Sequence, residues 1–250
     1  MQTKNVDYNV RQSNLYIILY SAAITVVCGG LLAFASISLR DKQQQNIEHE
    51  RKQNILATVI DLKETDNVED IYAKRVKEIV IDFQGNAKTE IKASSIDIAK
   101  EYKKKPEERL LPVYEFRSEA DPAKVENAVI PVYGYGLWNN IWGFVALQSD
   151  LNTVQGVKFE HAGETPGLGA RITSEEIQLR YKGKKVFEGD DVSSVVMMKG
   201  EGMDYTNDSH KVDGMSGATL TGKGVNNMLK DYFACYKNYL KKNQQISLNL

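Results

Sequence analysis

The sequence predicts an α+β protein, in which an N-terminal transmembrane helix precedes a soluble domain with a twisted, largely antiparallel sheet and flanking helices. Three observations lead to this prediction. An uncharged apolar run fills residues 15–39, strand and helix patterns then alternate irregularly, and the C-terminal segment carries an amphipathic helical stripe. Because the repeated strand–helix units of a doubly wound sheet do not stand out, antiparallel pairing is favoured.

Residues 14–39 are predicted to form the transmembrane helix. The run from Leu15 to Leu39 contains no charged residue, and it is long enough to cross the hydrocarbon core of a bilayer. A cleaved signal peptide is the competing interpretation, because Ala33-Phe34-Ala35-Ser36 resembles a cleavage site. The apolar run is longer than a usual signal core, which favours an uncleaved anchor. Basic residues lie on both sides of the run, so charge counting does not decide its orientation.

Three further segments complete the predicted organisation. Residues 1–13 are assigned to an N-terminal cytoplasmic segment. Residues 40–66 are assigned to a juxtamembrane helix and linker, because Asp41 to Lys63 mixes Gln, Glu, Lys and Arg with spaced Ile, Leu and Val. Residues 67–245 are assigned to the soluble domain.

Strand signals recur along this domain, with alternating apolar residues bounded by turn formers. The predicted strands and hairpin cover Ile79 to Phe83, Leu111 to Phe116, Ile130 to Gln148, Val154 to Glu160 and Val192 to Met198. A helix is predicted over Thr173 to Tyr181, because Thr173-Ser174-Glu175-Glu176 is a helix-start pattern.

A longer helix is predicted at the C-terminus, since apolar residues recur there at spacings of three and four. The stripe consists of Val225, Met228, Leu229, Tyr232, Phe233, Tyr236, Tyr239 and Leu240. Thr219 then lies at or just before the helix N-terminus, where unpaired N–H groups and the helix dipole stabilise a phosphate. Alternatively, Ser216, Thr219 and Thr221 simply offer N-cap side chains.

Composition excludes several classes of site. The chain has 32 Lys and Arg against 33 Asp and Glu, and this balance predicts no nucleic-acid partner. Cys28 and Cys235 fall in the apolar run and in the C-terminal helix, so neither a disulfide framework nor an iron–sulfur centre is expected. The three His residues are scattered and predict no metal site.

Two glycine-containing stretches carry the functional signal. The first is Asp213-Gly214-Met215-Ser216-Gly217-Ala218-Thr219, in which Gly217 and Ala218 leave the Thr hydroxyl open to approach. The second is His161-Ala162-Gly163-Glu164-Thr165-Pro166-Gly167-Leu168-Gly169. There the glycines on either side of Leu168 let the backbone pass close to a flat ligand, although a tight surface turn explains the pattern equally well.

The first stretch resembles the signature at which flavin transferases attach FMN through a phosphodiester bond to the final Thr. The chain as a whole is similar to the family of C subunits of bacterial Na+-translocating NADH:quinone oxidoreductases. This resemblance covers nearly the whole chain. The motifs that carry it, in order, are Arg51-Lys52-Gln53-Asn54-Ile55-Leu56, Gly136-Leu137-Trp138, Gly143-Phe144-Val145-Ala146-Leu147, Glu164-Thr165-Pro166-Gly167-Leu168-Gly169 and the Thr219 motif. The sister family, the G subunits of the Rnf complexes, shares the last two motifs and is the second choice.

The resemblance implies one covalent FMN, attached at Thr219, and electron relay within a multi-subunit membrane complex. It implies a domain on the outer face of the cytoplasmic membrane, an anchor in membrane lipid and a flavin transferase during maturation. NADH is then oxidised by another subunit, and this chain has no catalytic residue of its own. The implied cofactor-binding residues are Asp213, Ser216, Gly217, Ala218, Thr219, Leu220, Thr221, Glu164, Thr165, Gly167, Leu168, Gly169 and Trp138. Trp138 and Trp142 are alternatively ordinary core aromatics.

Two functions from other classes remain open at this point. One is a membrane-anchored flavoprotein that reduces a soluble acceptor directly. The other is a scaffold protein without a cofactor, in which the Thr219 motif is only a helix cap.

Overall fold

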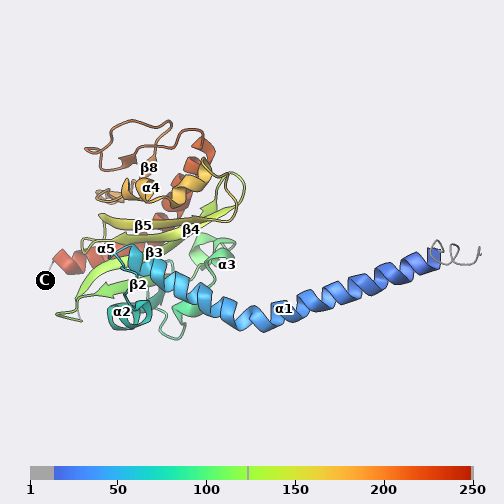
Figure 1. Ribbon diagram of the computed structural model, residues 1–250. Helices are drawn as coiled ribbons and strands as arrows, with labels where there is room; N and C mark the ends of the chain where they lie inside the picture. Colours follow the sequence, from blue (N-terminus) through green and yellow to red (C-terminus); the bar gives the residue numbers. More distant parts are fainter. Residues whose placement is uncertain (1–13, 123, 249–250) are drawn as a thin grey trace, which may run out of the picture. The chain divides into compact units, whose positions relative to one another are not determined.

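A computed structural model describes residues 14–122 and 124–248, so the predicted cytoplasmic segment 1–13 lies outside the described residues. The chain divides into two compact units, Met1–Glu50 and Arg51–Leu250. Helix α1 (Asn14–Ala57) runs through the boundary between them (Figure 1). In the described part of the chain, α1 is the one helix that is long and apolar enough to cross a membrane.

Helix α1 ends at Ala57, whereas the sequence predicts helix to about Lys63. The Thr58 hydroxyl donates to the carbonyl oxygen of Ile55 at 2.6 Å, and the β-branched residues Val59 and Ile60 follow. A Thr hydroxyl that bonds to a nearby carbonyl oxygen competes with the backbone bonds of a helix. β-branched residues such as Val and Ile have a lower helix propensity. The last turns of α1 are already part of the second compact unit, because Ile55 and Leu56 are fully buried in its core.

The second unit is built on a five-stranded antiparallel sheet whose strands follow one another in sequence order. The strands are β1 (Val76–Ile81), β2 (Leu111–Arg117), β3 (Val125–Tyr135), β4 (Asn140–Leu147) and β5 (Val154–His161). This architecture confirms the predicted α+β class with a largely antiparallel sheet. Strand β1 ends earlier than predicted, because Asp82 accepts the backbone N–H of Asn86 and closes a turn.

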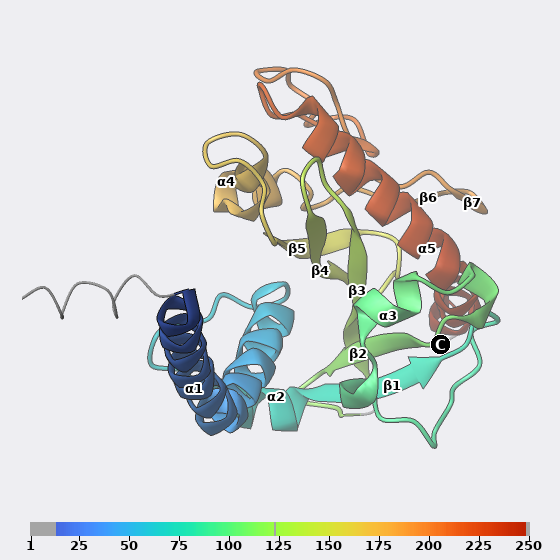
Figure 2. The same cartoon turned by 90° about the vertical axis from the view of Figure 1, so that its right-hand side faces the viewer.

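Side chains that alternate along these strands bury both faces of the sheet. Helix α5 (Thr219–Leu248) covers one face, and its predicted apolar stripe is buried throughout against residues such as Val113, Ile130 and Val145. The end of α1 and helix α2 (Val68–Arg75) cover the other face, where Leu56 and Tyr72 join Phe116 and Phe144. Figure 2 shows α5 and α2 on opposite sides of the sheet.

Helix α2 is absent from the sequence prediction, although its signals are present. Asn67 caps it by accepting from the backbone N–H groups of Glu69 and Asp70. Acidic residues in its first turn and Lys74 and Arg75 in its last turn complement the helix dipole. The short length of this segment hides its apolar periodicity.

Shorter elements connect the sheet to α5 and the other helices. They are η1 (Ala93–Ser95), α3 (Ile98–Tyr102), η2 (Pro106–Glu108), η3 (Gly169–Thr173), α4 (Glu175–Leu179), β6 (Phe187–Glu188), β7 (Asp191–Val192), β8 (Val196–Met197) and β9 (Lys211–Val212). The strand predicted over Val192 to Met198 is interrupted, because Ser194 adopts a left-handed conformation with φ of 62°. The helix predicted from Thr173 begins instead at Glu175. In Figure 1, α4 and β8 lie beyond the β5 edge of the sheet.

Candidate functional site

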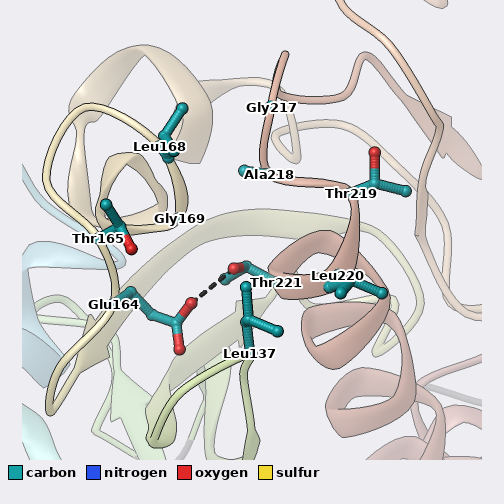
Figure 3. A pocket seen from close by; sticks show the side chains of 10 residues that line it. All are labelled: Leu137, Glu164, Thr165, Leu168, Gly169, Gly217, Ala218, Thr219, Leu220 and Thr221. Carbon is teal, nitrogen blue, oxygen red and sulfur yellow. Dashed lines mark hydrogen bonds between the residues drawn. The ribbon is translucent and has the colours of Figure 1, made fainter.

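Thr219 is the first residue of α5, and it stands at a cleft of about 190 Å³, here called the first cleft. Three segments line this cleft: the turn between β3 and β4, the glycine-rich turn after β5, and the start of α5. The lining residues are Leu137, Glu164, Thr165, Leu168, Gly169, Gly217, Ala218, Thr219, Leu220 and Thr221. Figure 3 shows the Thr219 hydroxyl pointing away from Glu164.

A buried carboxylate joins the three segments. The Thr221 hydroxyl donates to Oε2 of Glu164 at 2.6 Å, and the backbone N–H groups of Trp138 and Asn139 donate to Oε1 at 2.9 and 3.3 Å. The dashed line in Figure 3 marks the first of these bonds. Burial opposes ionisation of Glu164, but the hydrogen bonds outweigh it and hold the pKa of this carboxyl below its ordinary value. Glu164 is therefore an ionised residue that fixes the shape of the cleft.

Two glycines make room for this carboxylate. A Cβ on Gly136 would lie 2.5 Å from Oε1 of Glu164, and a Cβ on Gly169 would lie 2.6 Å from Oε2. Gly167 is required for a different reason, because its φ of 75° suits glycine while the space around it is open. The structure therefore gives each glycine a different reason: Gly167 adopts a positive φ, and Gly169 leaves room for the Glu164 carboxylate.

The loop before Thr219 is held by a charged network. The backbone N–H of Ser216 donates to Oε2 of Glu201 at 3.0 Å, and Arg171 pairs with the same carboxylate through two bonds of 2.9 and 2.6 Å. Arg180 donates to Oε1 of Glu201 at 3.1 Å and to the carbonyl oxygen of Gly214 at 2.5 Å. The Arg171 guanidinium, followed by the Ser216 N–H, lowers the pKa of Glu201 to about 2.

Asp213 belongs to the same network. Its carboxylate accepts the backbone N–H groups of Gly202 and Met203 at 2.8 and 3.1 Å and lies 3.5 Å from Nη1 of Arg180. Asp213 therefore ties the segment around residue 202 to the start of the Thr219 loop. It lies outside the lining of the first cleft.

A second cleft, of about 320 Å³, shares Ala218 and Thr219 with the first and is otherwise lined by different residues. Its remaining lining is Val196, Met197, Met198, Lys199, Met215, Gly222, Lys223 and Asn226. Sequence patterns do not reveal this surface, because its members come from β8 and the two residues after it, the Thr219 loop and the start of α5. Lys199 and Lys223 give it a positive charge, whereas Glu164 gives the first cleft a negative one.

Apolar side chains surround the mouth of the first cleft. Trp138 is 70% exposed, and its indole N–H donates to the Thr165 hydroxyl at 3.1 Å. Leu137, Leu168 and Leu220 are also exposed. Trp138 is thus not a core aromatic. Leu137 also lies at the rim, although it is not among the predicted cofactor-binding residues. Clustering of such residues at a cleft marks a binding surface.

Most of the predicted cofactor-binding residues come together at the first cleft. Those that line it are Glu164, Thr165, Leu168, Gly169, Gly217, Ala218, Thr219, Leu220 and Thr221. Ser216, Gly167 and Trp138 lie next to lining residues in the chain. Asp213 does not line the cleft, and it holds the start of the Thr219 loop by accepting the backbone N–H groups of Gly202 and Met203. Within residues 14–122 and 124–248, no group of three His, Cys, Asp or Glu side chains could hold a metal ion.

The chain is similar to known proteins over most of its length. The family model of the FMN-binding domain matches residues 136–234, which include the β3–β4 turn, the glycine-rich turn and the Thr219 loop. The chain is 33% identical over 225 residues to the C subunit of the Na(+)-translocating NADH-quinone reductase of Haemophilus ducreyi, covering 84% of this chain and 86% of the relative. It is 30% identical over 256 residues to the corresponding C subunit of Neisseria meningitidis serogroup A, covering 96% of each.

A solved structure resembles the chain as well. The crystal structure of the C subunit of the Na(+)-translocating NADH-quinone reductase from Parabacteroides distasonis superposes with a TM-score of 0.69 and 31% sequence identity. The match covers 81% of this chain and 96% of that structure. The similarity therefore extends to the fold of the second compact unit.

Proposed function

Since this chain belongs to the family of C subunits of Na+-translocating NADH-quinone reductases, we propose that it relays electrons through an FMN attached by a phosphodiester bond to Thr219. The family, predicted from the order of sequence motifs, is confirmed by the relatives. The covalent bond and the residues around the flavin belong to the proposal.

The position of Thr219 is the observation that carries the proposal. Thr219 is a half-buried residue in the first turn of α5, and it lines both clefts. The first N–H groups of a helix lack intrahelical acceptors, and the helix dipole favours negative charge there. A phosphodiester on Thr219 is therefore stabilised by the helix to which it is attached.

The residues around Thr219 suit the rest of an FMN. The exposed apolar side chains of Leu137, Leu168 and Leu220 offer contact for a flat ring. Gly169 and Gly217 also line the cleft, and without side chains they leave room for the ring next to the backbone. FMN, when bound, supplies reversible electron uptake and release. The protein's part is to hold the ring, limit its contact with water and fix the charges near it.

Assembly and topology follow from the same proposal. The chain has no Gly-x-Gly-x-x-Gly stretch after a strand, so NADH oxidation is assigned to another member of the complex. Helix α1 anchors the chain in the membrane, and we place the second compact unit on the outer face. The partners are thus the other subunits, membrane lipid and, during maturation, a flavin transferase.

Co-expression of the full-length chain with a flavin transferase tests the proposal. We expect intact-mass spectrometry to show the addition of one FMN with loss of water, and a denaturing gel to show yellow fluorescence at the chain's mass. A chain that stays unlabelled, while a known acceptor is labelled in the same cells, contradicts the proposal and favours a scaffold protein. Turnover of the isolated labelled chain with NADH would instead support a self-sufficient reductase.

A further inference from the structure

The charge of the first cleft comes from one side chain. Among the ten described residues that line it, Glu164 alone has an ionisable side chain. That side chain belongs to a residue only 4% exposed to solvent. Solvent and salt screen a buried charge much less than an exposed one, so its field reaches any ligand held in the cleft.

The geometry of Glu164 does not suit a direct ligand of the cofactor. Both carboxylate oxygens already accept hydrogen bonds from the protein, with Oε2 on the Thr221 hydroxyl and Oε1 on the backbone of Trp138 and Asn139. Gly136 and Gly169 close on the carboxylate from two further directions. The protein therefore already uses both oxygens of Glu164 to hold the three segments of the cleft together.

We propose that Glu164 is a positioning residue that keeps a fixed negative charge in the cleft proposed to hold the flavin and thereby lowers the flavin's reduction potential. This inference rests on the proposed function, because it requires FMN on Thr219. It differs from the sequence expectation, in which Glu164 is a polar contact of the cofactor. Glu164 acts through the field of its carboxylate and through the three segments that it joins.

Charge decides the direction of this effect. Reduction adds electrons to the flavin, which the complex draws from NADH and passes on to the quinone, and proton uptake balances the added charge only in part when the ring is shielded. A nearby carboxylate raises the free energy of the more negative, reduced form. The reduction potential therefore falls, and the flavin becomes a stronger electron donor to the next carrier.

For a flavin ring held in the second cleft, the expected shift in reduction potential has the opposite sign, so this cleft provides a control. Its charged residues, Lys199 and Lys223, would stabilise the reduced form and raise the potential if the ring lay there. Replacing a lysine there would then lower the potential. The two clefts can be distinguished by the sign of the shift.

The test is a redox titration of the full-length, flavinylated chain in detergent, followed by absorbance. Glu164→Gln removes the charge while keeping the shape of the side chain, and we expect the FMN to remain on Thr219 while its midpoint potential becomes more positive. Lys223→Gln is the matched control, for which we expect a much smaller shift.

A second pair of variants serves if Glu164→Gln fails to fold. Leu137→Lys places a positive charge at the cleft without touching the carboxylate, and should raise the potential relative to Leu137→Gln. The inference is overturned by an unchanged potential in Glu164→Gln or in Leu137→Lys. It is also overturned if Lys223→Gln shifts the potential by as much as Glu164→Gln, because the ring would then lie at the second cleft. Absence of FMN from the wild-type chain contradicts the proposed function itself, which is a separate result.

Discussion

The backbone N–H of Ser216 donates to Oε2 of Glu201 at 3.0 Å, so the loop that leads to Thr219 is held by a carboxylate that is itself paired with Arg171 and Arg180. This bond connects segments that are 15 residues apart in the chain. It shows that the proposed acceptor loop has a defined conformation, maintained by charged groups outside its own motif.

Replacing the proposed acceptor should remove the cofactor and leave the fold. We expect Thr219→Ala to carry no FMN, because the hydroxyl is the proposed point of attachment. Its loss should lower the free energy of unfolding by at most about 0.5–2 kcal/mol, the range for a capping side chain. Intact-mass spectrometry and urea unfolding measure the two effects. Thr221→Val, which alters the neighbouring buried hydroxyl, should keep the adduct; an adduct retained in Thr219→Ala would place the acceptor elsewhere.

The charged network should matter for flavin attachment. In the proposed reaction the Thr219 hydroxyl oxygen would bond to the phosphorus of an activated FMN donor, the bond from that phosphorus to the donor's leaving group would break, and the hydroxyl proton would leave. We expect Asp213→Asn and Arg180→Gln both to slow labelling, because a loosened loop must be ordered again when the transferase binds. Initial rates of FMN incorporation provide the measurement.

Arg180→Gln is the informative variant of this pair, since Arg180 lies outside the motif that the transferase is expected to recognise. Lys182→Gln removes an exposed charge from the same segment and serves as the control. Labelling of Arg180→Gln at the wild-type rate would mean that Asp213 acts through recognition by the transferase and not through the order of the loop.

The two glycines of the turn after β5 should respond differently to alanine. Gly167→Ala meets open space but must adopt a φ of 75°, which costs about 1 kcal/mol. Gly169→Ala places a Cβ against Glu164 and Thr221, so it should be more destabilising and should shift the flavin absorbance. Thermal unfolding and visible spectra compare the variants. Equal stability and identical spectra would show that the first cleft is not shaped by Gly169.

Glu201 should contribute to stability in a defined pH range. Its folded pKa of about 2 lies below the ordinary value of 4.5, so its stabilising contribution is complete above about pH 4.5 and is lost as the pH falls towards 2. We expect Glu201→Gln to be less stable than the wild type at pH 6, with the difference shrinking by pH 3. Urea unfolding of a chain beginning at Asp41 measures it; a difference that does not depend on pH would contradict the assignment.

Truncation should separate the anchor from the domain. The full-length chain should resist extraction by carbonate or high salt, because α1 is held by apolar burial and not by charge. A chain from about Asp41 should be soluble and folded. One that begins at residue 67, the predicted start of the domain, lacks Ile55 and Leu56 and should lose several kcal/mol of stability, as for deleted core side chains. Equal stability of the two truncations would support a domain that starts at residue 67. A mature chain beginning near Ser36 would support signal cleavage.

Much of the fold could be predicted from local patterns. The stripe from Val225 to Leu240 gives the C-terminal helix, and the alternating strands give the antiparallel sheet, because side-chain periodicity reports directly which residues face a core. Helix α2 and the break at Ser194 could not be predicted in this way. A helix of two turns shows little periodicity in its sequence. The left-handed conformation of Ser194 is held by contacts outside its own segment, such as the bond from its N–H to the carbonyl oxygen of Val186.

The sequence by itself determined the family, an apolar run long enough to span a membrane and Thr219 as the candidate acceptor, since each depends on residue types at short spacings along the chain. Only the tertiary structure decided what Glu164 and Asp213 do, because their partners lie far away in sequence: Thr221 for the first, Gly202, Met203 and Arg180 for the second. It also revealed the second cleft, whose lysines come from separate elements. Hydrogen bonds and charge interactions depend on the distance between groups in space. Folding sets that distance, and it cannot be read from the spacing of residues along the chain.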